Sequence, residues 1–404
     1  MTELTARELL AHLYETAVDT VDGRRLLQQW CVENRSPVFS HCIAIGKAAP
    51  AMLQGTLDCQ HSIKSALLIS AREYIPAELR DNKSIKIQES THPVPDQLCL
   101  NAGTELVAYL KAIPEGSSVL VLISGGTSSM VEMPVHGYSL EQIQQIYEYL
   151  LASGMDIHAM NAWRKCFSQI KGGGLLAYTD HVHITQLMIS DVQGNNPAVI
   201  GSGLLVQSDI DERIADEWLQ SRVTHTDSSP QFYNPVDTRV IGSIELAARS
   251  AAEEAERQGF DSTYHEQFID GDAIAQGRAI GEWLISAPAG VHVWGGETTV
   301  QLPDNPGLGG RNQTLALAMA EVLDQQQDIT VLVAGTDGID GNTTCAGAII
   351  SGQTKQKAEQ MGFDIGSELA KANAGVVLMA TDDLFQPGPS NTNVMDIIIA
   401  HKRN

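Results

Sequence analysis

The sequence is poor in basic residues, in cysteine and in long apolar runs, and each shortage excludes a class of protein. Lys and Arg number 26 against 49 Asp and Glu, which gives a net charge of −23 over 404 residues. This balance predicts no partner among nucleic acids or anionic membranes, because both are bound by broad basic surfaces. It is compatible with a phosphate ligand, since a few cations and backbone N–H groups can set the field inside a small site.

The six cysteines are scattered without a C-x-x-C pair, which predicts reduced thiols rather than a disulfide frame or a zinc site. No apolar run approaches the roughly 18 residues of a membrane span. The first residues do not include a basic segment followed by an apolar run and a cleavage site, so we expect no targeting signal. Thr5 and Glu8 there have the spacing of a capping box and predict an amphipathic helix. Its apolar face would hold Leu10, Leu13, Ala17 and Val21. We therefore expect a cytoplasmic protein.

The rest of the chain has an ordinary globular composition, with 43% hydrophobic and 19% charged residues. At roughly 150 residues per domain it would hold two or three domains. Short β-rich runs alternate with helical stretches, which predicts an α/β fold with a mainly parallel sheet. A segment rich in Thr, Asp, Ser and Pro, from Arg222 to Pro235, predicts a linker between two lobes. The strands expected are 39–45, 66–69, 85–88, 119–123, 184–189, 291–294, 298–302, 329–334, 376–379 and 394–400.

Small or ionisable residues follow five of these strands. In open α/β sheets ligands bind outside the carboxyl ends of the strands, against helix N-termini. One glycine pair at such a place is ordinarily a tight turn, so the prediction of a binding site depends on all five together. The segments are Gly46-Lys47, Ser124-Gly125-Gly126, Ser190-Asp191, Gly295-Gly296-Glu297 and Thr336-Asp337-Gly338.

The segment from Ser124 to Ser129 has the composition of a phosphate-binding loop. Its glycines allow the backbone to approach an anion, and its hydroxyls can donate hydrogen bonds. It matches neither the Walker A pattern nor G-x-G-x-x-G. Lys47 also stands where a dinucleotide fold needs a further glycine, which disfavours a Rossmann dehydrogenase. We expect Lys47 to be a cation facing the site, with a solvated surface lysine as the alternative.

Three further residues suit phosphoryl transfer. Arg311 begins a helix after two glycines and could bind phosphate or carboxylate with two hydrogen bonds, or form a surface ion pair. Asp337 and Asp340 could hold a divalent cation or act as a base, although Asp-Gly is also common in turns. Cations, a glycine-hydroxyl loop and several carboxylates together favour magnesium-assisted phosphoryl transfer.

The order of these motifs resembles that of the class II glycerate kinases (glycerate 2-kinases) with a C-terminal MOFRL domain, over nearly the whole chain. Further matching segments include His92-Pro-Val-Pro-Asp96, Arg164-Lys165, Ile170-Lys-Gly-Gly173, Gly309-Gly-Arg-Asn-Gln313, and Thr392-Asn-Val394 with Asp396. The resemblance implies a Rossmann-like N-terminal domain at 1–230 and a C-terminal α/β domain at 231–404, with the MOFRL region at about 288–400. It also implies an active site in the interdomain cleft.

The activity implied is the ATP-dependent phosphorylation of the small molecule D-glycerate to 2-phosphoglycerate with Mg²⁺. By this resemblance the catalytic residues are Lys47, Arg311 and Asp337, and the residues near the metal are Asp191 and Glu297. The residues that would bind the phosphates of ATP are Ser124, Gly125, Gly126 and Ser128. A homodimer is one arrangement compatible with the sequence.

The chain departs from the family pattern in segments that surround the expected site. Thr127 and Gly174 replace a glycine and an arginine, Asn195 and Asn196 replace two aspartates, and Leu204 replaces a proline. Three alternatives therefore stay open: a kinase of another hydroxy acid, a weakly catalytic paralogue that binds nucleotide or acid, and a hydroxypyruvate reductase. Retention of all the expected catalytic residues argues against a pure binding protein, and the missing dinucleotide fingerprint argues against the reductase.

Overall fold

The computed structural model describes residues 5–35, 37–92, 95–153, 155, 157–207, 216–223 and 234–403. The chain forms two compact units, one of Gly23–Gly242 and one that joins Met1–Asp22 to Ser243–Asn404. The sequence analysis expected a single division after residue 230. That position and most of the predicted linker lie outside the described residues.

The N-terminal helix α1 (Ala6–Thr20) packs against elements of the C-terminal unit. The predicted capping box is confirmed, because the Thr5 N–H donates to the Glu8 carboxylate and the Thr5 hydroxyl accepts from the Glu8 N–H. The predicted apolar face is also confirmed: Leu10, Leu13, Ala17 and Val21 are all buried. Amphipathicity predicts that this face is covered, but it does not say by which sheet.

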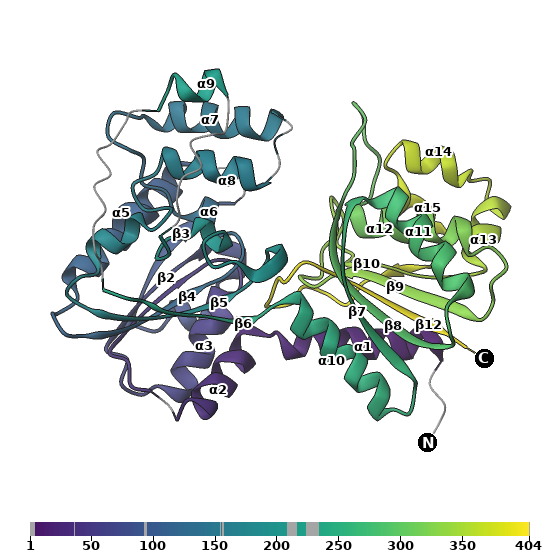
Figure 1. Cartoon of the computed structure of the whole chain (residues 1–404), viewed down its shortest axis with the longest axis horizontal. Coiled ribbons are helices and arrows are strands. Elements are labelled where there is room, and N and C mark those ends of the chain that lie inside the picture. Colours follow the sequence, from purple (N-terminus) through teal and green to yellow (C-terminus); the bar gives the residue numbers. More distant parts are fainter. Residues whose placement is uncertain are drawn as a thin grey trace. The chain divides into compact units, whose positions relative to one another are not determined.

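The unit of Gly23–Gly242 contains a six-stranded, wholly parallel sheet in the order β3-β2-β1-β4-β5-β6 (Figure 1). This is the strand order of the Rossmann fold, so the predicted Rossmann-like sheet is confirmed. The strands are β1 (His41–Ile45), β2 (Ser65–Ala71), β3 (Ile85–Ser90), β4 (Ser118–Ile123), β5 (His183–Ile189) and β6 (Asp237–Gly242).

Helices cover both faces of this sheet, which explains why β4 is apolar and buried from Val119 to Ile123. The helices α2 (Gly23–Glu33) and α3 (Ala49–Cys59) pack on one face, and α5 (Gln97–Ala112) packs on the other (Figure 1). A smaller apolar cluster joins α7 (Leu140–Ala152), α8 (Ile157–Cys166) and α9 (Glu217–Gln220). The short elements are α4 (Ala77–Arg80), α6 (Thr127–Met130), η1 (Arg72–Tyr74), η2 (Gly174–Tyr178), η3 (Gln193–Asn195) and η4 (Ile200–Ser202).

The second unit contains a six-stranded mixed sheet in the order β11-β10-β9-β12-β8-β7. Only β7 and β8 are parallel, and the other neighbours in this sheet run antiparallel. The strands are β7 (Ser262–Asp272), β8 (Gly290–Thr299), β9 (Ile329–Gly335), β10 (Gly347–Ser351), β11 (Leu384–Phe385) and β12 (Asp396–Lys402). The α/β class predicted for this half is therefore confirmed, with mixed rather than parallel pairing.

Helices pack on both faces of the mixed sheet as well (Figure 1). The helices α1 and α10 (Ile244–Arg257) pack against β8, β9 and β12. The helices α11 (Ala273–Ser286) and α12 (Arg311–Val322) share an apolar cluster with the opposite face. Around α12 lie the short helices α13 (Thr354–Gln360), α14 (Ile365–Ala370) and α15 (Ala374–Ala380).

Two sequence predictions in this unit were wrong. The two strands expected at 291–294 and 298–302 are the single strand β8, which passes through Gly295-Gly296-Glu297 without a turn. Glycine is required there for close approach, since a Cβ on Gly296 would lie 2.3 Å from the Ile269 carbonyl oxygen. The strand expected at 376–379 is part of α15, because a short apolar run suits a buried helix as well as a strand.

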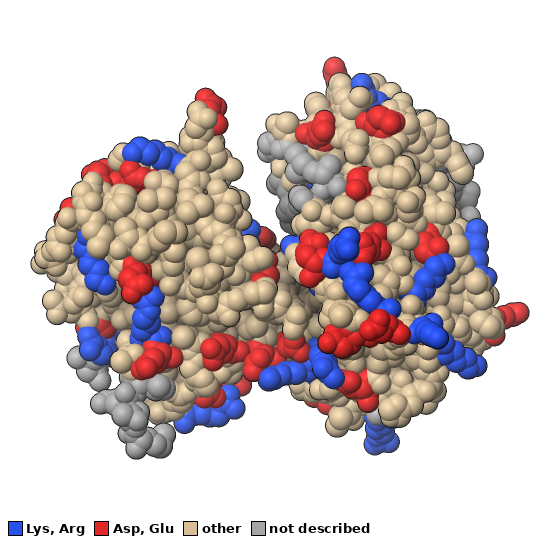
Figure 2. Space-filling view, turned by 180° about the vertical axis from the view of Figure 1, so that it is seen from behind, with Lys and Arg blue, Asp and Glu red and all other residues tan. Residues whose placement is uncertain are grey.

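The coloured side chains on the face drawn in Figure 2 show Lys and Arg interspersed with Asp and Glu. The ion pairs of the described residues include Arg24–Asp58 and Arg80–Glu89. Among the described helices, none has the length and apolar character needed to cross a bilayer.

Candidate functional site

Three loops of the Gly23–Gly242 unit meet at the carboxyl ends of neighbouring strands. β4 lies between β1 and β5 in the sheet, with Ile45 opposite Ile123 and Ile123 opposite Met188. The residues after these strands include Lys47, Ser124-Gly125-Gly126 and Asp191. The order of the sheet reverses between β1 and β4, which is where Rossmann-type sheets bind ligands.

Main-chain hydrogen bonds join the first two loops. The Lys47 N–H donates to the Gly125 carbonyl at 2.9 Å, and the Ala48 N–H donates to the Ser124 hydroxyl at 3.1 Å. A Cβ on Gly125 would lie 2.6 Å from Asp191 Oδ2. A Cβ on Gly126, whose φ is +84°, would lie 3.3 Å from Lys47 Cγ. The two glycines therefore allow Lys47 and Asp191 to approach the same backbone.

Burial raises the pKa of Asp191, while its own N–H, the nearby Lys47 ammonium and the Gly126 N–H oppose the rise. Desolvation, and then the positive charge of Lys47, lower the pKa of His92 to about 4, so this imidazole is neutral at pH 7. The charge of Lys47 thus lowers the pKa of two groups beside the glycine loop, Asp191 and His92. The arrangement is one cation and one carboxylate at a loop whose backbone a ligand can approach.

The hydroxyls of this loop form hydrogen bonds mainly with other groups of the protein. Ser124 is fully buried and its hydroxyl accepts from Ala48, which limits its access to a ligand. Thr127 is also buried and donates to the carbonyls of Ile45 and Ser124. The half-buried Ser128 lies 2.6 Å from the Ser202 hydroxyl. Phosphate binding by Ser124 and Ser128 stays a prediction, and Ser128 is the more accessible of the two.

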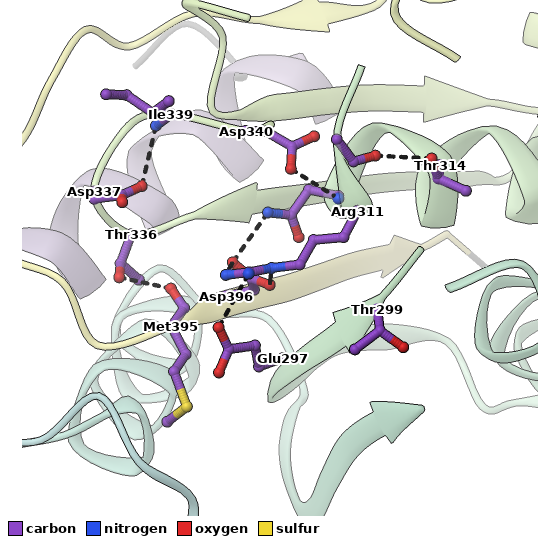
Figure 3. A network of polar contacts seen from close by, with 12 residues as sticks. Glu297, Thr299, Arg311, Thr314, Thr336, Asp337, Ile339, Asp340, Met395 and Asp396 are labelled. Atoms are coloured by element: carbon purple, nitrogen blue, oxygen red, sulfur yellow. Dashed lines mark hydrogen bonds and ion pairs between the residues drawn. The ribbon is translucent and has the colours of Figure 1, made fainter. Parts of the chain in front are cut away.

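In the second unit, Arg311 at the start of α12 binds two carboxylates (Figure 3). Its Nε and Nη2 donate to the Asp396 oxygens at 2.5 and 3.1 Å, and its Nη1 lies 3.0 Å from Glu297 Oε1. β12 runs antiparallel to β8 and β9, so Asp396 at its start meets their carboxyl ends. Burial opposes the charged guanidinium, but Asp396, Glu297 and Asp340 raise the pKa of Arg311 overall.

Asp340 caps the N-terminus of the same helix. Its two carboxylate oxygens accept from the backbone N–H groups of Asn312 and Gln313 at 3.1 and 2.8 Å. Burial is the largest influence and raises the pKa of Asp340 to about 7. The Asn312 amide also donates to Asp396, at 3.0 Å, which links the two buried carboxylates.

Asp337 closes its own turn after β9, since its Oδ1 accepts from the Ile339 N–H at 3.1 Å. Figure 3 places it on the same loop as Asp340, beside the Arg311 group. Its charge also contributes, after burial, to raising the pKa of Tyr14. Its catalytic role stays a prediction.

The fit of the structure to Mg²⁺ is limited. Within the described parts of the chain, no group of three or more Asp, Glu, His or Cys side chains could hold a metal ion. The predicted ligands Asp191 and Glu297 belong to different units, and Glu297 is paired with Arg311. These residues suit only an ion held largely by nucleotide phosphates and water, as Mg²⁺ often is in kinases.

The structure shows the surroundings of several residues that depart from the family pattern. Gly174 has no room for a side chain, because a Cβ would lie 2.2 Å from the Gln169 carbonyl oxygen. Asn195 adopts a left-handed conformation with φ of +53°, which asparagine tolerates well. Asn196 accepts from the Ala198 N–H, and Leu204 is buried in the core beside the parallel sheet.

Sequence reasoning gave no role to Asp396, which binds Arg311. The signal was present, because Asp396 follows the matched segment Thr392-Asn-Val394. Its importance depends on antiparallel pairing of the last strand, which the pattern of apolar residues did not reveal. The structure thus joins Lys47, Gly125, Gly126 and Asp191 in one unit, and Arg311 and Glu297 in the other.

A Rossmann-order sheet with charged loops at its switch point, followed by a mixed α/β unit, is the architecture of an α/β enzyme that binds small ligands. The profile for Domain of unknown function (DUF4147) matches residues 9–231, and that for the MOFRL family matches residues 290–396. The chain is 31% identical to a D-glycerate 2-kinase of Thermotoga maritima, covering 88% of this chain and 89% of that protein. A relative from Agrobacterium vitis is 34% identical, covers 89% of this chain and 98% of that protein, and carries the unproven name of hydroxypyruvate reductase.

The crystal structure of the glycerate kinase from Thermotoga maritima has the same fold, with a TM-score of 0.88 and 28% identity. The alignment covers 98% of this chain and 99% of that one. The chain therefore belongs to the glycerate 2-kinase family with a C-terminal MOFRL domain.

Proposed function

We propose that this protein is an ATP-dependent kinase that phosphorylates D-glycerate to 2-phosphoglycerate. The observation that carries the proposal is the meeting of Lys47, the glycine loop and Asp191 at the switch point of a Rossmann-order sheet, in a chain of the glycerate 2-kinase family. Backbone N–H groups and a cation at such a place suit the phosphates of a nucleotide.

Each charged group has a role in this proposal. Lys47 and Arg311 stabilise the negative charge that spreads over the phosphoryl group during transfer. Asp337 accepts the proton of the substrate hydroxyl. Glu297 and Asp396 hold the Arg311 fork in one orientation. Gly125 and Gly126 let the Asp191 and Lys47 side chains lie close to the backbone that would bind the phosphates.

Mg²⁺, when bound with the nucleotide, would neutralise charge on the phosphate oxygens, and Asp191 is the carboxylate best placed beside the glycine loop to contact it. We expect turnover to stop in excess EDTA and to return when Mg²⁺ is added. Full activity in EDTA would remove the metal from the mechanism. Soluble cytoplasmic location and a homodimer are further parts of the proposal.

The activity is tested by incubating the purified chain with ATP, Mg²⁺ and D-glycerate while ADP release is followed by a coupled assay. Adding enolase then identifies the product, because enolase consumes 2-phosphoglycerate and not 3-phosphoglycerate. L-Glycerate, tartronate and hydroxypyruvate extend the assay to other acids. An NAD(H)-dependent absorbance change with hydroxypyruvate, in the absence of ATP, would support the reductase instead.

A further inference from the structure

Arg164 on α8 lies among buried groups. Within the described part of the chain it forms no ion pair with a carboxylate. Its guanidinium carbon lies 4.9 Å from the centre of the Tyr147 ring, and its Nη1 donates to Asn161 Oδ1 at 3.3 Å. The Nε atom is buried, and among the described residues it has no hydrogen-bond partner. A buried guanidinium N–H without an acceptor is costly, so a missing acceptor is the simplest reason for this arrangement.

The buried carboxylate beside Tyr147 is already occupied. Glu132 forms an ion pair with Lys171, accepts from the Tyr147 hydroxyl at 2.7 Å and accepts from the Met133 N–H at 3.0 Å. Both side chains of the Lys171–Glu132 pair are almost completely buried. Arg164 therefore adds a positive charge that the described groups around it leave uncompensated, and such a charge favours the entry of an anion.

A series of contacts within the Gly23–Gly242 unit links α8, which carries Arg164, to the glycine loop at Ser124–Ser129. The next residue, Lys165, lies against Gly172, where a Cβ would be 3.3 Å from Lys165 Cδ. The Gly172 N–H donates to the Ser202 carbonyl at 2.9 Å, and the Ser202 hydroxyl contacts Ser128 beside the glycine loop. α8 and the loop that holds Lys47 are thus joined by an unbroken series of contacts.

We propose that Arg164, aided by Asn161, binds the carboxylate of the acid substrate; this inference rests on the proposed function. The Nε edge of a guanidinium offers two parallel N–H groups, which match the two oxygens of a carboxylate. One uncompensated charge also suits a monoanionic acid better than a multiply charged phosphate. Arg164 would therefore determine the preference for small hydroxy acids over uncharged polyols.

The main test compares wild type with Arg164→Lys, which keeps the charge and removes the fork. The KM for D-glycerate should rise on the order of tenfold to a hundredfold, which is the usual effect of losing a charge-assisted pair of hydrogen bonds. The KM for ATP should stay within about twofold. The preference for D-glycerate over glyceramide, which has the same shape without the negative charge, should shrink by a similar factor.

Two further variants make the test specific. Asn161→Asp is nearly isosteric and places a carboxylate beside Arg164, so it should also weaken D-glycerate binding, even if Arg164→Lys does not fold. Arg222→Lys is the control, because Arg222 also stacks on an aromatic ring, 3.6 Å from the centre of Trp218, but donates to the Trp218 and Ser221 oxygens. This control should leave both KM values unchanged.

An unchanged KM for D-glycerate in folded Arg164→Lys and Asn161→Asp would overturn the assignment while leaving the kinase proposal intact. Calorimetric titration of the same proteins with D-glycerate separates the two proposals, because it needs no turnover. If wild type binds D-glycerate without phosphorylating it, only the proposed function fails. If wild type neither binds nor phosphorylates it, both proposals fall.

Discussion

At the scale of single residues, the two candidate cations differ in how firmly the protein holds them. Arg311 is fixed by Asp396, whose side chain is only 5% exposed, and also by the more exposed Glu297. Removing Arg311 would leave the Asp396 charge buried and unpaired, a change that commonly costs about 3–5 kcal/mol. Loss of activity in Arg311→Ala could therefore come either from misfolding or from the loss of a catalytic group. Lys47 gives a cleaner test.

We predict that Lys47→Met lowers kcat/KM on the order of a hundredfold or more, because the ammonium matters most when charge develops on the moving phosphoryl group. Methionine keeps the length of the side chain, so the melting temperature should change little. Steady-state kinetics with ATP and D-glycerate measure the effect, and thermal unfolding is the control. A folded variant with the wild-type rate would make Lys47 a surface charge.

Asp340 gives a prediction about pH. Its pKa is about 7 in the folded protein against an ordinary value of 3.8, so the folded state keeps a proton that the unfolded state has lost. Between about pH 4 and pH 7 this residue makes stability fall as pH rises, by at most about 1.4 kcal/mol per unit, and above pH 7 the effect is complete. Asp340→Asn should lose this part of the slope.

Urea unfolding at several pH values between 5 and 8 measures this difference between wild type and Asp340→Asn. The exposed Asp270 is the matched control, since Asp270→Asn removes one carboxylate without removing a buried one. Parallel pH dependence in wild type and Asp340→Asn would show that Asp340 does not keep its proton.

At the scale of elements, the sequence was most informative where strands are buried on both faces. β4 is apolar after its first residue, Ser118, and the sequence predicted it to within one residue. The loop that follows it contains the glycines that Lys47 and Asp191 approach. It was least informative in the mixed sheet. Gly295 and Gly296 were interpreted as the end of a strand, but they lie in the middle of β8. Glycine is needed there because Ile244 and Ile269 approach the backbone of the strand. Local patterns do not reveal such tertiary contacts.

The first residue of η2, Gly174, gives a prediction about the family arginine that it replaces. Because a Cβ there would meet the Gln169 carbonyl oxygen at 2.2 Å, Gly174→Arg should destabilise the fold by about 1–3 kcal/mol and should not increase activity. Denaturant unfolding and kinetics measure both effects. Gly366→Arg is the control, since the nearest atom to a Cβ there is 3.7 Å away. Higher activity in Gly174→Arg would show that the loop can restore the family arrangement.

At the scale of the whole molecule, the chain begins in one compact unit, forms the second and then returns to the first. The sequence predicted the helix α1 and its buried face but placed it in the N-terminal domain. Its position depends on contacts with α10, β9 and β12, more than 200 residues away, and on the hydrogen bond from the Tyr14 hydroxyl to the Gly335 carbonyl. Such distant pairing cannot be inferred from the amphipathic pattern of one helix.

This connectivity predicts which part of the protein a mutation in α1 will weaken. Leu13 is fully buried, so Leu13→Ala should cost about 2–5 kcal/mol of stability. The loss should appear in amide hydrogen exchange of peptides from 243–403, while peptides from 23–242 keep their protection. Leu53→Ala, which truncates an equally buried leucine on α3, should give the opposite pattern. If Leu13→Ala instead reduced protection in peptides from 23–242 alone, the N-terminal helix would belong with the parallel sheet, as the sequence first suggested.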